Sequence, residues 1–120
     1  MTSLELTQKI VSILDKKKAL NIRVIKIRDL TVLSDYFIIA SGTSTTHVRS
    51  LCDEVEFQMK NNDGVLPDHT EGRDSRQWIL MDYESVVLHV FSGETREFYD
   101  LERLWKDGEQ ISLAQLGIQE

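Results

Sequence analysis

The stretch DYFIIASGTSTTHVRSLC, from Asp35 to Cys52, sets the architecture that the rest of the chain must fit. Its first part, Asp35 to Ser41, is the densest apolar run of the chain and is rich in aromatic and β-branched residues, which predicts a central β-strand. Gly42, Thr43 and Ser44 end that strand and supply helix caps. Apolar residues then recur at helical spacing to about residue 61, namely Val48, Leu51, Cys52, Val55 and Met59. The stretch therefore predicts a strand, a tight turn and a helix.

A helix and a second strand precede this unit. Thr2 and Glu5 form a capping-box pattern, and apolar residues at helical spacing extend the predicted helix to about Lys18. Residues 22–28 are rich in β-branched side chains and predict a strand. Because the loop at residues 29–34 is short, we expect the two strands to pair antiparallel.

A hairpin and a last helix follow the polar segment 62–76, in which Val65 and Leu66 could form a short edge strand. Two apolar runs, Trp78 to Asp82 and Val86 to Phe91, predict the hairpin. Residues 94–105 then predict a helix whose apolar stripe consists of Phe98, Leu101, Leu104 and Trp105.

The tail at residues 109–120 carries a weaker helical stripe, so it would dock on the domain, exchange with a neighbouring chain or fray. The order of elements, α-β-β-α-(β)-β-β-α, predicts an α+β fold with a mixed sheet of about five strands flanked by helices. The 120 residues fit one domain at residues 1–106, followed by a C-terminal tail at residues 107–120.

The composition limits the classes of function. Hydrophobic residues make up 41% of the chain and charged residues 28%, as in ordinary globular proteins. No apolar run approaches the roughly 18 residues of a membrane helix, and the first residues lack the pattern of a signal peptide, so we expect a cytoplasmic protein without membrane contacts. The net charge of −6 disfavours direct nucleic acid binding and favours a basic protein partner.

Candidate sites for chemistry have simpler explanations. The turn Gly42 to Ser44 could hold an anion at a helix N-terminus, but helix capping explains the same residues and is the favoured interpretation. A nucleotidyltransferase needs two or three converging carboxylates for its magnesium ions. Asp82 ends one hairpin strand, whereas Val86 to Phe91 contains no acid. We therefore expect no metal and no other cofactor.

The histidines and the single cysteine also favour structural roles. No metal-ligand spacing links His47, His69 and His89. His47 lies in a first helical turn, where we expect it to be solvated, and His69 lies in a polar loop. His89 alternates with apolar residues, which predicts a half-buried side chain bonded to a backbone or carboxylate group. Cys52 lies on an apolar helix face, where a thiol is usually inert.

One face of the first hairpin strand carries Trp78, Leu80 and Asp82, and the other carries Ile79 and Met81. One of these apolar faces must cover the core. The other is covered either by a helix or by another molecule, because a Trp and a Leu followed by an acid have the composition of an interface hot spot. The alternation alone favours burial of this face under a helix.

Several segments form a joint pattern between about residue 4 and residue 105. These segments are Asp35–Ile39 with Ser41–Ser44 and His47–Val48, Glu71–Gly72, Trp78–Tyr83, Val86–Phe91 and Arg96–Trp105. In this order they resemble the ribosomal silencing factors, also called Iojap-like proteins. The sequence departs from the family at Glu84–Ser85, where a Gly-Asp turn is common, and in a longer tail after Lys106.

The resemblance implies a nucleotidyltransferase-like fold without catalysis and a function as a translational repressor. Such a factor binds ribosomal protein L-fourteen on the large ribosomal subunit, blocks joining of the small subunit and damps translation when nutrients are short. The resemblance also implies that the strand face with Trp78, Leu80 and Asp82 is exposed and contacts the partner. The partner-binding residues expected here are Trp78, Leu80, Asp82, Tyr83, Tyr99, Asp100 and Glu102.

Two other functions remain open. A large-subunit assembly factor would use the same surface at an earlier stage, and a magnesium-dependent nucleotidyltransferase-like enzyme is the less favoured alternative. An exposed apolar strand face would also favour a homodimer of the free protein.

Overall fold

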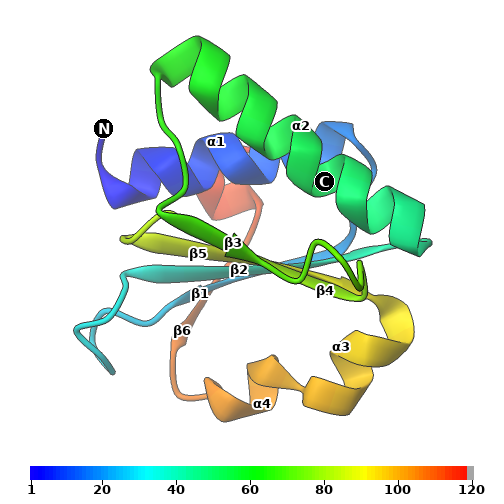
Figure 1. The fold of residues 1–120 in the computed structure, drawn as a ribbon. Coiled ribbons are helices and arrows are strands. Elements are labelled where there is room, and N and C mark those ends of the chain that lie inside the picture. Colours follow the sequence, from blue (N-terminus) through cyan, green and yellow to red (C-terminus); the bar gives the residue numbers. More distant parts are fainter. Residues whose placement is uncertain (119–120) are drawn as a thin grey trace.

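A six-stranded mixed sheet lies between two layers of helices in the computed structural model, which describes residues 1–118 (Figure 1). The strand order is β3-β4-β5-β2-β1-β6. The strands are β1 (Leu20–Lys26), β2 (Tyr36–Gly42), β3 (His69–Glu71), β4 (Trp78–Asp82), β5 (Val86–Ser92) and β6 (Glu109–Ile111). The predicted α+β class is confirmed, and the sheet has six strands rather than about five.

Helices cover both faces of the sheet. The long helices α1 (Ser3–Lys16) and α2 (Thr45–Asp63) lie side by side on one face, and the short helices α3 (Gly93–Tyr99) and α4 (Leu101–Leu104) lie on the other (Figure 1). A 3-10 turn, η1 (Ala114–Leu116), follows β6. Within residues 1–118, no helix combines the length and apolar character needed to cross a membrane.

The central strand β2 pairs in both directions, as its apolar sequence predicts. It runs antiparallel to β1, which confirms the expected pairing, and parallel to β5, with which it aligns from Tyr36 and Val86 to Gly42 and Ser92. Ser44 then caps α2, because its hydroxyl oxygen accepts a hydrogen bond of 3.1 Å from the backbone N–H of His47.

Two apolar clusters hold the layers together. The larger one fills the space between the sheet and helices α1 and α2, and β4 contributes Ile79 and Met81 to it. The smaller one lies on the opposite face and consists of Ile25, Ile27, Ile39 and Phe91, with Phe37, Trp78, Leu101 and Trp105 packed against them. Strand β4 therefore belongs to both clusters, through alternate residues.

The predicted helix at residues 94–105 is interrupted. Asp100 adopts a left-handed conformation with φ 46°, which ends α3 and precedes the single turn of α4. The predicted apolar stripe is accordingly split, since Phe98 is 82% exposed and Leu104 is 72% exposed, whereas Leu101 and Trp105 pack against the smaller cluster.

The two edge strands also differ from the prediction. The short strand before the hairpin is His69–Glu71, and Val65–Leu66 forms no strand. In the tail, the expected helical stripe is replaced by β6, which pairs antiparallel with β1, and by η1, whose Leu116 is buried in the larger cluster. The tail therefore docks on the domain, and its last two residues, Gln119 and Glu120, lie outside the described residues.

Candidate functional site

Strand β4 presents Trp78, Leu80 and Asp82 on the side of the sheet that α3 and α4 cover only in part; these three residues are called the β4 face below. All three are partly exposed, whereas the alternating residues Ile79 and Met81 are fully buried. Alternation along a strand is sufficient to produce this division.

Trp78 is both a core residue and a surface residue. Its ring stacks on Phe91 at a centroid distance of 5.0 Å and lies 4.7 Å from the ring of Tyr99 on α3. Its indole Nε1 donates a hydrogen bond of 3.1 Å to Nδ1 of His89. Trp78 is thus held rigidly by these contacts, whereas the partly exposed Leu80 belongs to neither apolar cluster.

His89 differs from its prediction in burial and in partner. It is 4% exposed rather than half-buried, and its partner is the Trp78 indole rather than a backbone or carboxylate group. Because Nδ1 accepts the hydrogen bond from the indole, it carries no proton, and the proton of the neutral ring lies on Nε2. Burial lowers the pKa of His89 to about 4, so the ring is neutral at physiological pH and serves to fix Trp78.

Asp82 supports the hairpin turn. Its Oδ1 accepts a hydrogen bond of 2.7 Å from the backbone N–H of Glu84, and its Oδ2 lies 3.6 Å from Nδ1 of His69 on β3. His69 is therefore a strand residue beside the β4 face. Residues 1–118 contain no group of three or more His, Cys, Asp or Glu side chains that could hold a metal ion.

The other three predicted partner-binding residues on this side of the sheet have different surroundings. Tyr99 is the last residue of α3, Asp100 follows it, and Glu102 lies on α4. Tyr99 is 51% exposed and covers one side of Trp78. Asp100 and Glu102 line a pocket of about 710 Å³ near the carboxyl end of β2. Glu102 is paired through both carboxylate oxygens with the buried Arg96, at 3.0 and 3.1 Å, so most of its charge is neutralised internally.

Tyr83 does not lie with the other predicted partner-binding residues. It is 6% exposed and packs in the larger cluster, on the opposite face of the sheet from Trp78, and burial raises the pKa of its hydroxyl. The sequence already contains the reason, because Tyr83 is one residue out of phase with Leu80 and Asp82.

Exposed apolar residues extend the surface beyond the predicted set. Phe98 precedes Tyr99 on α3, and its ring lies 5.2 Å from that of Tyr99; Leu104 ends α4. Both residues belong to the predicted apolar stripe of one continuous helix, because the break at Asp100 has no signal in the apolar spacing. Through Tyr99, which contacts Trp78, the exposed ring of Phe98 therefore adds an apolar side chain at one side of the β4 face.

The other candidates for chemistry are occupied by structural contacts. The backbone N–H of Thr43 donates to Nδ1 of His47 at 2.9 Å, and Nε2 of the same ring lies 3.0 Å from the carbonyl oxygen of Lys17. His47 is therefore hydrogen-bonded through both nitrogens rather than simply solvated. Cys52 is fully buried, as its place on the apolar helix face predicts, and burial raises the pKa of its thiol to about 12.

Comparisons with known proteins give one consistent family. The family model described as ribosomal silencing factor during starvation matches residues 1–120. The chain is 31% identical over 113 residues to ribosomal silencing factor RsfS of Halalkalibacterium halodurans, an alignment that covers 94% of this chain and 96% of that protein. It is also 36% identical over 100 residues to a Mus musculus protein named mitochondrial assembly of ribosomal large subunit protein 1, covering 80% of this chain and 43% of that protein.

A solved structure has the same fold. The crystal structure of a Chromobacterium violaceum protein aligns with a TM-score of 0.85 at 32% sequence identity and covers 93% of this chain and 92% of that one. The match therefore extends over most of both chains. By its sequence and its fold, the chain belongs to the ribosomal silencing factor family.

Proposed function

We propose that this protein is a translational repressor that binds the large ribosomal subunit through the β4 face and thereby blocks joining of the small subunit. The observation that carries the proposal is the β4 face itself, on a chain of this family. On this face, Leu80 lies outside both apolar clusters. The neighbouring Trp78 is held in place by its contacts with His89 and Phe91.

A rigid aromatic anchor favours tight binding because little side-chain entropy is lost on association. Trp78 and Leu80 would form the desolvated centre of the contact, with Tyr99 and Phe98 at its border. Hot-spot residues typically contribute 2 kcal/mol or more each to binding. The arrangement therefore supports a protein partner rather than a small-molecule substrate.

The partner that we propose is ribosomal protein L-fourteen. A basic ribosomal protein complements the net charge of −6, while the rRNA around it would repel an acidic factor and so restrict where it can dock. Asp82 and Asp100 are the partly or fully exposed acids of the proposed contact, whereas Glu102 is held by Arg96. Direct contact with nucleic acid would then be small.

We infer a binding protein without catalysis or cofactor, acting in the cytoplasm and damping translation when nutrients are short. The names of the relatives, which describe silencing and assembly factors, support this class of function. A nucleotidyltransferase-like enzyme remains the less favoured alternative.

An assembly function is the second candidate, and the name of the mouse relative favours it. Both functions would use the same face, but at different stages. An assembly factor leaves mature subunits free to join, whereas a repressor acts on mature subunits.

Self-association would use the partly exposed Leu80 and the exposed Phe98. A dimer of the free protein that buries Leu80 and Phe98 would compete with the ribosome, since both need the β4 face and its border. Such a dimer should dissociate when large subunits are added.

A joining assay with purified mature subunits tests the proposal. The protein is incubated with large subunits before small subunits are added, and the fraction of joined ribosomes is measured on sucrose gradients. We expect an equimolar amount of protein to prevent joining, and ribosomes that are already joined serve as the control. Normal joining in the presence of protein bound to large subunits would overturn the occlusion mechanism and favour assembly.

A further inference from the structure

A small pocket lies at the end of the sheet where β4 ends and β5 begins. Its volume is about 280 Å³, which suits one long side chain rather than a whole ligand. Two segments form it: residues 32–35, from the loop between β1 and β2, and residues 83–85, from the hairpin turn. The backbone N–H of Asp35 joins the segments by donating a hydrogen bond of 2.8 Å to the carbonyl oxygen of Ser85.

The loop exposes apolar side chains that the core does not use. Val32 is fully exposed and Leu33 is 81% exposed, which is unusual for neighbouring aliphatic residues in a loop. The loop begins with a turn in which the carbonyl oxygen of Ile27, a member of the smaller cluster, accepts hydrogen bonds from the backbone N–H groups of Leu30 and Thr31. The loop then extends from the sheet on the side of α3 and α4 (Figure 1). Val32 and Leu33 therefore lie at the pocket beside the hairpin turn that follows β4.

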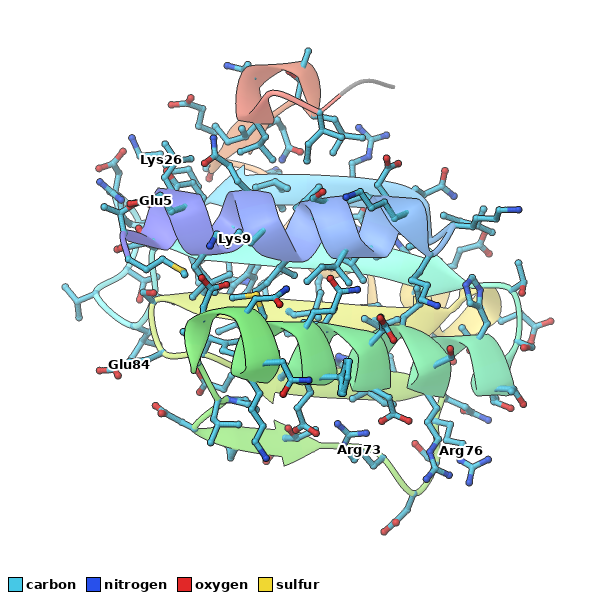
Figure 2. The ribbon with its side chains drawn as sticks, turned by 90° about the horizontal axis from the view of Figure 1, so that it is seen from above. Glu5, Lys9, Lys26, Arg73, Arg76 and Glu84 are labelled. Atoms are coloured by element: carbon cyan, nitrogen blue, oxygen red, sulfur yellow. The ribbon has the colours of Figure 1, made fainter. Side chains whose placement is uncertain are left out.

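The turn on the other side of the pocket supplies a free carboxylate. Glu84 projects outward at the same end of the molecule as the loop (Figure 2). No lysine, arginine or histidine of residues 1–118 lies within ion-pair distance of its carboxylate, and the carboxylate of Asp35 is paired only loosely, at 3.6 Å from Arg28. The pocket thus combines an apolar wall with two acids.

Ser34 provides a further unused polar group. It lines the pocket and is 6% exposed, and its hydroxyl has no hydrogen-bond partner among the residues that the structure describes. A buried hydroxyl without a partner is unfavourable, and a donor brought by another molecule would relieve it.

We propose that this pocket receives a lysine or arginine side chain of the large-subunit partner, as a second contact beside the β4 face. The aliphatic stem of such a side chain packs on Val32 and Leu33, and its charged end meets Glu84 and Asp35. This inference rests on the proposed function, because it names the chemistry of the partner that the β4 face binds.

Continuity with the β4 face supports this partner over an unrelated one. The carboxylate of Asp82 accepts a hydrogen bond from the backbone N–H of Glu84. Asp82 of the β4 face and Glu84 of the pocket therefore belong to the same turn. A basic protein that covers Leu80 would reach the pocket along Asp82 without leaving the surface.

The conformation of Glu84 makes a matched test available. Its φ is 72°, in the left-handed region that Asn and Asp tolerate better than Glu. Glu84→Asp and Glu84→Asn therefore relieve similar backbone strain and differ from each other only in charge. Any difference between these two variants in affinity for the partner reports the carboxylate rather than the fold.

The experiment measures the affinity of each variant for purified large ribosomal subunits at low and high salt. We expect Glu84→Asn to bind about fivefold more weakly than Glu84→Asp at low salt, and the difference to vanish at high salt. The double variant Val32→Ser, Leu33→Ser should bind about tenfold more weakly than wild type. Phe57→Ser, which removes a 61% exposed apolar side chain from α2 on the other face, should bind as wild type does.

The outcomes separate this inference from the proposed function. If Leu80→Ser weakens binding while the Glu84 pair and the Val32, Leu33 variant bind normally, the pocket is not a contact and the β4 face remains one. If wild type fails to bind large subunits, both proposals fail. Thermal unfolding of every variant verifies that the domain is folded.

Discussion

The indole of Trp78 and the imidazole of His89 form a partly buried hydrogen bond of 3.1 Å that joins strand β4 to the neighbouring strand β5. The bond fixes the anchor of the β4 face to the core of the sheet. Truncation of Trp78 would therefore damage the fold as well as the surface, because it leaves Nδ1 of a buried ring without a donor. Leu80 is the cleaner probe of binding.

The buried His89 should make stability depend on pH. The pKa of its ring is about 4 in the folded protein and ordinarily 6.5, so the unfolded chain takes up a proton first as the pH falls. The contribution of the neutral His89 ring to the free energy of unfolding is fully present above pH 6.5 and is lost as the pH falls toward 4. Thermal unfolding between pH 7.5 and 4.5 should show this loss, and His89→Gln should show a shallower dependence. An identical pH dependence in the variant would contradict the assignment.

The pairing of Arg96 with Glu102 should hold α3 and α4 in place over the smaller cluster. Arg96 bridges the break at Asp100 and also donates to the hydroxyl of Ser41 at 2.9 Å. Arg96→Met should lower the free energy of unfolding by about 2 kcal/mol, less than for a fully buried pair because Glu102 is one-third exposed. Denaturant unfolding measures it. Arg103→Met, an exposed change on α4, is the control, and equal stability of the two variants would show that the pairing contributes nothing.

Gly72 should be required for the approach of the loop after β3 to Trp78. Its φ is 87°, and a Cβ atom there would collide with the carbonyl oxygen of Trp78. Gly72→Ala should cost at least about 2 kcal/mol, from left-handed strain and the displaced backbone. Gly93→Ala is a matched control, because a Cβ atom there meets nothing within 4 Å. Equal melting temperatures for the two variants would be inconsistent with this geometry.

The thiol of Cys52 should be unreactive in the folded protein. It is fully buried, and burial raises its pKa to about 12, so hardly any thiolate forms at pH 8. A thiol reagent should modify it only as fast as the protein unfolds, and rapidly in guanidinium chloride. Fast modification under native conditions would show that α2 opens readily.

The sequence predicts those parts of the fold that have an apolar period of their own. β2, the hairpin and the capped helix α2 carry such patterns, and so does the alternation that separates Trp78 from Ile79. The edge strands β3 and β6 could not be found in this way. Each has three mostly polar residues and exists because a neighbouring strand offers unpaired backbone groups.

The candidate site shows the same limit. The phase of the alternation places Trp78, Leu80 and Asp82 together and, applied consistently, also excludes Tyr83. The state of Glu102 depends on Arg96, six residues earlier across a break that the apolar spacing does not reveal. The sequence places Val32 and Leu33 in a short loop, and only the fold shows that no other element covers these apolar side chains.

The most direct test of the β4 face is the effect of Leu80→Ser on the large subunit. Co-sedimentation and the subunit-joining assay are performed with wild type, Leu80→Ser and the control Phe57→Ser, after thermal unfolding has shown all three to be folded. We predict that Leu80→Ser loses binding and no longer prevents joining, while Phe57→Ser behaves as wild type. A folded Leu80→Ser protein that binds large subunits and blocks joining as strongly as wild type would contradict the central claim.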